Sequence, residues 1–138
     1  MNETFVVGSE SVHLKEIRDK VSRFLSDKAF SDKTREDLLV AIGEACANSM
    51  RHSYENKPAQ KIEVTLQDDS DKIIFKIRDF GKKIDLSKIQ TPKLPPVKPH
   101  GLGIYFMQTI MDSVQYNTQH TEGNELILTK YKETRSRQ

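Results

Sequence analysis

Apolar residues recur every three or four positions in the first third of the chain, which is typical of helices that bury one face. The pattern predicts a helix over residues 12–25, with Ser9 or Ser11 as its N-cap, after a short strand at 4–7 that is rich in β-branched and aromatic residues. The same spacing predicts a second helix from residue 31 or 32 to about 53.

Alternating polar and apolar residues replace this spacing in the middle of the chain and near its end. Residues 61–66 and 72–79 alternate and are joined by a polar turn, which predicts an antiparallel hairpin. Two more strands are expected near 114–118 and 125–131. Together with the helices, these strands predict an α+β sandwich, in which a mixed, mostly antiparallel sheet carries its helices on one face.

A long loop separates the two pairs of strands. Residues 80–100 hold four of the five prolines, and long loops without structure of their own often serve as lids or binding loops. We therefore expect a lid at about 82–100, followed by a helix from Gly101 to Asp112. The polar tail 132–138 is expected to fray.

Composition narrows the class of protein. The 138 residues fit one domain spanning 1–138, and a net charge of +2 is too small for a dedicated nucleic-acid binder. Cys46 is the only cysteine, which excludes an intrachain disulfide and a cysteine-based zinc site. No apolar run approaches the roughly 20 residues that span a bilayer, and no signal segment opens the chain. We therefore expect a cytoplasmic protein that binds neither membranes nor nucleic acid.

Three polar residues stand at intervals of four on the second predicted helix. Glu44, Asn48 and His52 should project toward one side, because a step of four residues turns a helix by only about 40°. Glu44 and Asn48 lie in a stretch of small apolar residues, where an unpaired carboxylate or amide is costly. Water, a metal, backbone groups or a ligand can satisfy them, or else they lie at the solvent edge of the helix. For His52 we favour a structural place at the helix end.

Two short motifs can bind a ligand, and each also has a simpler interpretation. Asp79 ends a predicted strand shortly before Gly81, so its carboxylate can accept a hydrogen bond from an amino group such as that of adenine. The same residues can form an ordinary turn. Gly101 and Gly103 open a helix, whose free N–H groups can bind an anion. Neither the P-loop nor the dinucleotide-binding fingerprint fits this glycine pair.

The order of these motifs resembles that of the GHKL ATP-binding superfamily with its Bergerat fold. Residues 44–54 resemble its N box, 78–85 its first glycine box, and 100–104 with 111–112 its second glycine box. Residues 123–130 resemble its last strand. Within the superfamily, the compact size and short lid resemble the anti-sigma-factor serine kinases of bacterial partner switching.

The resemblance implies a role for each matching residue. It implies that Asn48 coordinates Mg²⁺ and that Glu44 is the base that activates a serine hydroxyl. It assigns Asp79 to the adenine amino group, with Gly81 keeping the wall beside the base open. The nucleotide phosphates are expected to contact two cationic side chains and the start of the last helix, namely Lys98, His100, Gly101, Leu102 and Gly103.

The resemblance also implies an activity and two partners. The chain is expected to be an ATP- and Mg²⁺-dependent protein serine kinase that phosphorylates a STAS-type anti-anti-sigma protein, sequesters a sigma factor and forms a homodimer. Two features depart from the family pattern: Lys83 replaces the second glycine of the first glycine box, and Pro99 and His100 stand where some relatives carry a phosphate-reaching arginine. The alternatives are a partner-switching module that binds nucleotide without transferring phosphate, and an interaction domain that binds no nucleotide.

Overall fold

A computed structural model describes residues 2–84 and 102–133, the side chains of 102–105 excepted. In chain order its elements are β1 (Asn2–Gly8), η1 (Ser11–His13), α1 (Leu14–Leu25), α2 (Asp32–Asn48), η2 (Ser49–Ser53), β2 (Lys61–Asp68), β3 (Lys72–Asp79), α3 (Leu102–Ile110), β4 (Ser113–Tyr116) and β5 (Asn124–Tyr131). η1 is a 3₁₀ turn, and η2 is a π-helical segment that continues α2. The expected lid beyond residue 84 and the tail beyond residue 133 lie outside the described residues.

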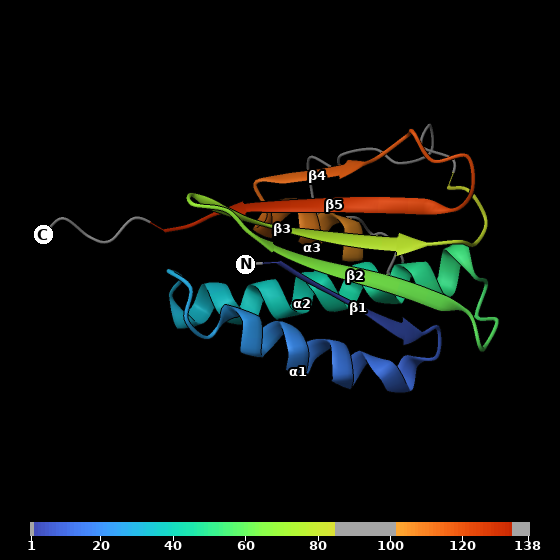
Figure 1. Ribbon diagram of the computed structural model, residues 1–138, viewed down its shortest axis with the longest axis horizontal. Coiled ribbons are helices and arrows are strands. Elements are labelled where there is room, and N and C mark those ends of the chain that lie inside the picture. Colours follow the sequence, from blue (N-terminus) through green and yellow to red (C-terminus); the bar gives the residue numbers. More distant parts are fainter. Residues whose placement is uncertain (1, 85–101, 134–138) are drawn as a thin grey trace, which may run out of the picture.

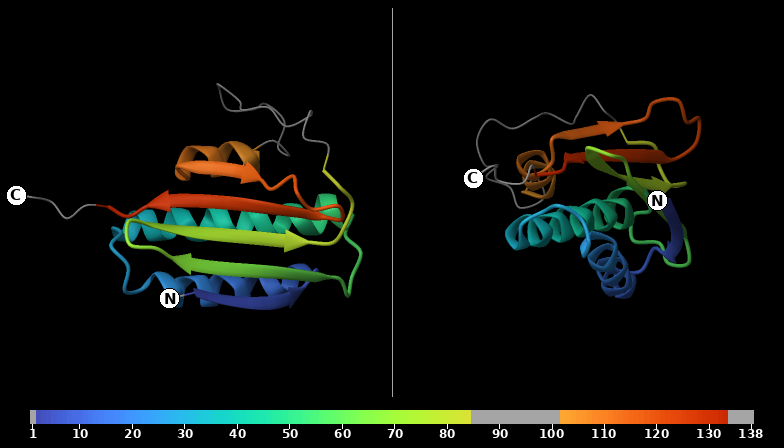
Figure 2. Two further views of the ribbon diagram at one scale, coloured as in Figure 1. Left: turned by 45° about the horizontal axis from the view of Figure 1, so that its top comes forward. Right: turned by 60° about the vertical axis from the view of Figure 1, so that its left-hand side comes forward.

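The strands form an open sheet in the order β1-β2-β3-β5-β4. All three α-helices cover one face of this sheet, and α2 packs against both α1 and α3 (Figures 1 and 2). This arrangement confirms the α+β sandwich with its helices on one face. Within the described residues the sheet is antiparallel throughout rather than mixed. β4 runs in the same direction as β3, but β5 lies between them, so these two strands form no parallel pair.

The core lies between the sheet and the helices. Alternate residues of β2 point into it, and Ile62, Val64 and Leu66 are fully buried, as the predicted alternation requires. From α1, Phe24 meets Phe75 of β3 edge-on, with 6.2 Å between the ring centroids. None of the helices in the described part of the chain is long and apolar enough to cross a lipid bilayer.

The predicted second helix begins as expected and ends in a wider turn. Ser31 is its N-cap, since its side-chain oxygen accepts a hydrogen bond from the Thr34 N–H at 3.1 Å. After Asn48 the helix continues as η2, where the Tyr54 N–H donates to the carbonyl oxygen of Ser49, five residues back, at 3.0 Å. The wider turn changes the direction in which the residues after Asn48 project.

Two smaller expectations are corrected. Neither Ser9 nor Ser11 is the N-cap of α1, because the Ser9 hydroxyl bonds the main chain of the 57–60 turn and Ser11 lies within η1, so that His13 precedes the helix. α3 ends at Ile110 rather than Asp112. Asp112 belongs to the sheet corner, where its carboxylate accepts a hydrogen bond from the Tyr131 N–H at 2.7 Å.

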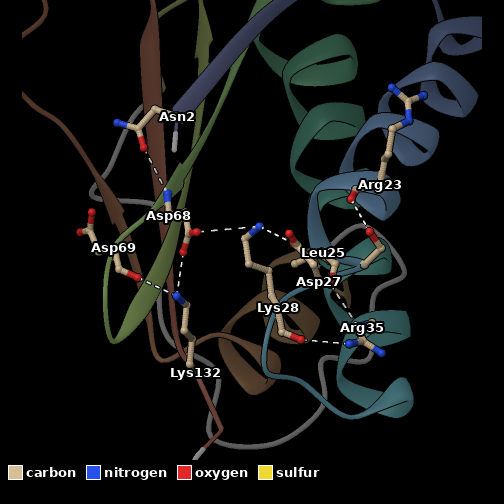
Figure 3. Close-up of polar contacts among 10 residues, drawn as sticks. Asn2, Arg23, Leu25, Asp27, Lys28, Arg35, Asp68, Asp69 and Lys132 are labelled. Atoms are coloured by element: carbon tan, nitrogen blue, oxygen red, sulfur yellow. Dashed lines mark hydrogen bonds and ion pairs between the residues drawn. The ribbon is translucent and has the colours of Figure 1, made fainter.

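The first residues of the expected tail are anchored rather than frayed. Lys132 Nζ lies 2.7 Å from Asp68 Oδ1, at the end of the molecule shown in Figure 3. The Glu133 carboxylate accepts hydrogen bonds from the Ser31 N–H and the Thr34 hydroxyl, each at 2.6 Å. The dipole of α2 favours an anion at this position. The end of β5 is therefore fastened to the helical layer.

Candidate functional site

Asp79 is the point at which three parts of the chain meet. It ends β3 and is 1% exposed. Its Oδ1 accepts hydrogen bonds from the Gly81 N–H and from the side-chain amide of Asn124, each at 3.1 Å. Its Oδ2 accepts one from the Ser49 hydroxyl at 2.9 Å. The first glycine box, the end of the N-box helix and the start of β5 are therefore in direct contact.

Glu44 and Asn48 lie one turn apart on α2, as their spacing predicts. Asn48 is 8% exposed, whereas 38% of the Glu44 side chain is exposed. Arg51 of η2 lies beside both, because its Nη2 donates to Asn48 Oδ1 at 2.9 Å and is 3.9 Å from Glu44 Oε2. The amide oxygen of Asn48 therefore accepts a hydrogen bond from a neighbouring cation, and Glu44 lies at the solvent edge of the helix. His52 is exposed.

The wide turn of η2 links this helix face to Asp79. Ser49 directly follows Asn48 and bonds the Asp79 carboxylate. Ser53, at the other end of η2, accepts a hydrogen bond from the Asn124 amide at 3.1 Å. The candidate metal ligand Asn48 is therefore one residue away from a side chain that touches the candidate adenine-binding carboxylate.

Gly81 is held tightly against the end of η2. A Cβ at this position would lie 2.4 Å from the Ser53 carbonyl oxygen and 2.8 Å from a ring carbon of Tyr54. The neighbouring Lys82 N–H donates to the same Ser53 carbonyl at 2.7 Å. Close packing therefore accounts for the absence of a side chain at Gly81, and its role beside a base stays a prediction.

Alanine at Gly81 is expected to destabilise the fold by about 1–3 kcal/mol, because the clash is with main-chain atoms that no side-chain rotation can relieve. Gly43 provides the control, since a Cβ there meets nothing within 4 Å. Alanine within α2 should stabilise that variant by roughly 0.5–1 kcal/mol. Urea denaturation of Gly81→Ala and Gly43→Ala measures the difference. Equal unfolding free energies would contradict the packing described for Gly81.

Lys83, which replaces the second glycine of the first glycine box, contacts the turn between β4 and β5. Its amine donates to the main-chain carbonyl of His120, in the turn between β4 and β5. A small pocket next to this contact is lined by residues 83–84, 116–118 and 123–125. The loop after β3 therefore contacts the β4–β5 turn, and Asn124 lines the pocket beside this contact.

Two tyrosines, Tyr54, which is buried, and Tyr116, which is half-buried, feel the charge of Asp79. The Tyr54 hydroxyl donates to the Lys61 carbonyl at 2.6 Å and accepts a hydrogen bond from the Phe80 N–H at 2.7 Å. Burial, together with the charge of Asp79, raises the pKa of Tyr54 above its usual range. The same two causes raise the pKa of Tyr116 to about 12. Both phenols are therefore neutral at physiological pH.

Part of the expected site lies outside the described residues, namely Lys98, His100 and Gly101. Leu102 and Gly103 open α3, as expected. α3 packs against α2 and starts on the side of the molecule at which α2 and β3 end (Figures 1 and 2). The start of α3 therefore lies on the same side as the end of β3, and the contact of the second glycine box with phosphates stays a prediction.

Four residues whose side chains take part in these contacts were not among the expected site residues: Ser49, Arg51, Ser53 and Asn124. Arg51 stands three positions after Asn48, and this helical spacing could have indicated that the two side chains are neighbours. Ser49 could have been found only from the geometry of η2. Asn124 is 45 residues from Asp79 in sequence, and no local pattern links the two.

The chain is similar to a family of ATPase domains and to several bacterial serine-protein kinases. Residues 7–130 match the family described as histidine kinase-like ATPase domain. "Serine-protein kinase RsbW" of Oceanobacillus iheyensis is 32% identical over 110 residues, which cover 74% of this chain and 68% of that protein. The protein of the same name from Bacillus velezensis is 27% identical over 133 residues, covering 91% and 82%. That from Bacillus pumilus is 30% identical over 125 residues, covering 83% and 76%.

Proposed function

Because this chain belongs to the family of histidine kinase-like ATPase domains, we propose that it binds ATP with Mg²⁺ and transfers the terminal phosphate to a serine of a partner protein. The contact of Ser49, Gly81 and Asn124 with the Asp79 carboxylate is the observation that supports this most directly. It joins the N box, the first glycine box and the last strand in one place. The "Serine-protein kinase" in the names of its relatives supports the choice of reaction.

Asp79 is the proposed partner of the adenine amino group. The two oxygens of a carboxylate offer about four acceptor positions. Among the described donors, two bond Oδ1 and one bonds Oδ2. Oδ2 therefore keeps acceptor capacity for an N–H of the base. Gly81, which has no side chain, keeps the wall beside the base open.

Asn48 suits Mg²⁺ in its chemistry. Its amide oxygen is a hard donor, and Mg²⁺ in nucleotide sites usually takes one or two protein ligands besides phosphates and water. Asn48 Oδ1 accepts a hydrogen bond from Arg51, so this oxygen already faces a position that holds positive charge. When bound there, Mg²⁺ neutralises negative charge on the phosphates during transfer.

Glu44 is the proposed base. It lies one turn from Asn48 and is partly exposed, so it can accept the proton of a serine hydroxyl that arrives from solvent. Arg51, between Glu44 and Asn48, supplies a cation that can stabilise charge on the transferring phosphoryl group. Lys98 and His100 stay further candidates for that role. The N–H groups at the start of α3 are proposed to bind phosphate oxygens.

The resemblance to anti-sigma-factor kinases supports two partners. The serine is proposed to belong to a STAS-type anti-anti-sigma protein, and the same chain is proposed to sequester a sigma factor. We propose that it acts in the cytoplasm, as one domain over 1–138 and as a homodimer. β1 is an edge of the sheet and Val6 on it is 55% exposed, so a second copy has an open strand edge to pair with.

The proposed function is tested by incubating the purified chain with ATP, Mg²⁺ and candidate STAS proteins. Mass spectrometry should then find phosphoserine on one of them, and calorimetry should show ATP binding. ATP binding without phosphoserine on any STAS protein would leave the partner-switching module as the better account. No binding of ATP at all would leave a domain that recognises only proteins.

Arg51→Met is expected to slow phosphoryl transfer by about 100-fold, because it removes a cation that contacts both Asn48 and Glu44. ATP affinity should fall less, since the proposed contacts of Asp79 with the adenine ring are unchanged. Arg23→Met, at an exposed position of α1, is the control and should change neither quantity. Single-turnover rates at saturating ATP measure the effect, and a wild-type rate for Arg51→Met would rule out the role given to Arg51.

A further inference from the structure

Asn124, the first residue of β5, joins three segments through its side chain and is 7% exposed. Its Nδ2 lies 3.1 Å from Asp79 Oδ1, 3.1 Å from Ser53 Oγ and 2.8 Å from the Lys82 carbonyl oxygen. Its Oδ1 accepts a hydrogen bond from the Ile84 N–H at 2.9 Å. The amide therefore fastens the end of β3, the end of η2 and the loop after β3 to one another.

The nitrogen and the oxygen of the Asn124 amide each have partners of the right hydrogen-bonding type. The three groups around Nδ2 can all accept a hydrogen bond, and the group at Oδ1 donates one, so the network itself fixes the orientation of the amide. An ionised carboxylate at position 124 could not donate to Asp79, and a serine is too short to reach both sides. The arrangement therefore requires a side chain that both donates and accepts at this length, which asparagine provides and aspartate or serine does not.

We propose that Asn124 is a positioning residue that holds the Asp79 carboxylate in the orientation that accepts a 6-aminopurine, and so favours ATP over GTP. The inference rests on the proposed function. Asn124 and the Gly81 N–H occupy Oδ1, whereas Oδ2 accepts one hydrogen bond among the described donors, from Ser49, and keeps an acceptor position for the amino group. GTP carries a carbonyl oxygen at the equivalent position, and an acceptor facing a fixed acceptor is disfavoured. Without the amide, the carboxylate can turn and this discrimination weakens.

The titratable and charged side chains around the pair come from several elements: Arg78 of β3, Tyr54 after η2, Tyr116 of β4, and His120 with Glu125 of the β4–β5 hairpin. Arg78 donates to the main-chain carbonyls of Asp79 and Asn124. The two phenols stay neutral near physiological pH, since burial raises the pKa of each. His120 bonds the Glu125 carboxylate next to Asn124, so the control variant must have the same neighbour.

The test replaces Asn124 with aspartate and measures ATP and GTP affinity by calorimetry between about pH 6 and pH 8.5, with no phosphoryl transfer involved. Two carboxyl groups at this distance share one proton at the lower pH, and that proton restores the hydrogen bond that the amide donates. At the higher pH both ionise and repel each other. ATP affinity of Asn124→Asp should therefore be near the wild-type value at pH 6 and about 10-fold or more weaker at pH 8.5, with the ATP-to-GTP ratio falling in parallel.

Asn117→Asp is the matched control. The Asn117 amide donates to Glu125 Oε1 at 2.9 Å, so the substitution creates the same pair of carboxyl groups next to His120 but away from Asp79. Its ATP affinity should follow the wild type at every pH. A second variant, Asn124→Ala, removes the amide without adding charge and should lower the ATP-to-GTP ratio at every pH, which keeps the test valid if Asn124→Asp folds poorly.

The outcomes distinguish a failure of the inference from a failure of the proposed function. A wild-type ATP-to-GTP ratio in Asn124→Ala, or the same pH response in Asn117→Asp as in Asn124→Asp, overturns the inference and leaves the proposed function standing. A wild-type chain that binds no ATP overturns both. A pH-dependent loss confined to Asn124→Asp, with a lowered ratio in Asn124→Ala, supports the positioning role.

Discussion

Phosphoryl transfer is expected to fall by about 10²–10⁴-fold in Glu44→Gln, while ATP affinity changes by less than about 3-fold. Glutamine keeps the length of the side chain and its place near Arg51, but it cannot take the proton of a serine hydroxyl. The Glu44 side chain is 38% exposed, so the fold should tolerate the change. Initial rates of phosphoserine formation, measured beside calorimetry with ATP and Mg²⁺, separate the two effects.

Glu36→Gln is the control for this variant. Glu36 is exposed on the same helix, two turns before Glu44, and the chemical change is identical. It should alter neither rate nor affinity. Transfer at the wild-type rate in Glu44→Gln would exclude Glu44 as the base, and a parallel loss of ATP affinity would indicate that Glu44 binds the nucleotide instead.

ATP affinity is expected to fall by about 100-fold, or about 2.7 kcal/mol, in Asp79→Asn. Three donors point at this carboxylate, from Ser49, Gly81 and Asn124. An amide at position 79 would set its own NH₂ against at least one of them and would lose an acceptor for the adenine amino group. GTP affinity should change much less, because GTP has no amino group at that position.

The matched control lies at the other end of the same strand. Asp71 directly precedes β3, and 67% of its side chain is exposed. Asp71→Asn should bind ATP as the wild type does. Asp79 is buried, so thermal unfolding of Asp79→Asn must accompany the titration. A folded Asp79→Asn variant with wild-type ATP affinity would contradict the assignment of adenine to this carboxylate.

Most of the fold can be predicted from local patterns in the sequence. The alternation in residues 61–66 and 72–79 predicts both strands of the hairpin, and the structure pairs them antiparallel, with Val64 opposite Ile77. The apolar spacing over 12–25 predicts the buried face of α1, where Ile17, Val21 and Leu25 are fully buried. These features depend on neighbours within one element, which is why periodicity alone finds them.

Contacts between distant residues are not visible in such patterns. The amide of Asn124 reaches Asp79 only because β5 lies beside β3, and no local pattern in the sequence marks this contact. The π-helical turn of η2 directs Ser49 and Ser53 toward the sheet, although the sequence predicts an ordinary helix there. Glu133 caps α2 across 102 residues, where composition predicts a frayed tail.

The candidate site likewise has features that the sequence predicts and features that only the tertiary structure shows. The spacing of Glu44 and Asn48 on one side of a helix follows from the sequence, and so does the place of Asp79 at a strand end. Their convergence depends on tertiary packing through Ser49. The roles of Lys98, His100 and the Gly101–Gly103 segment stay predictions from the resemblance, as do the partners.

A crystal structure with a non-hydrolysable ATP analogue and Mn²⁺ in place of Mg²⁺ tests the central claim most directly, because the anomalous signal of manganese marks the metal. The account predicts a manganese peak at bonding distance from Asn48 Oδ1, with the Arg51 guanidinium moved off that oxygen, and the amino group of the base on Asp79 Oδ2. Manganese away from Asn48, or a purine bound on a surface that does not include Asp79, would contradict it.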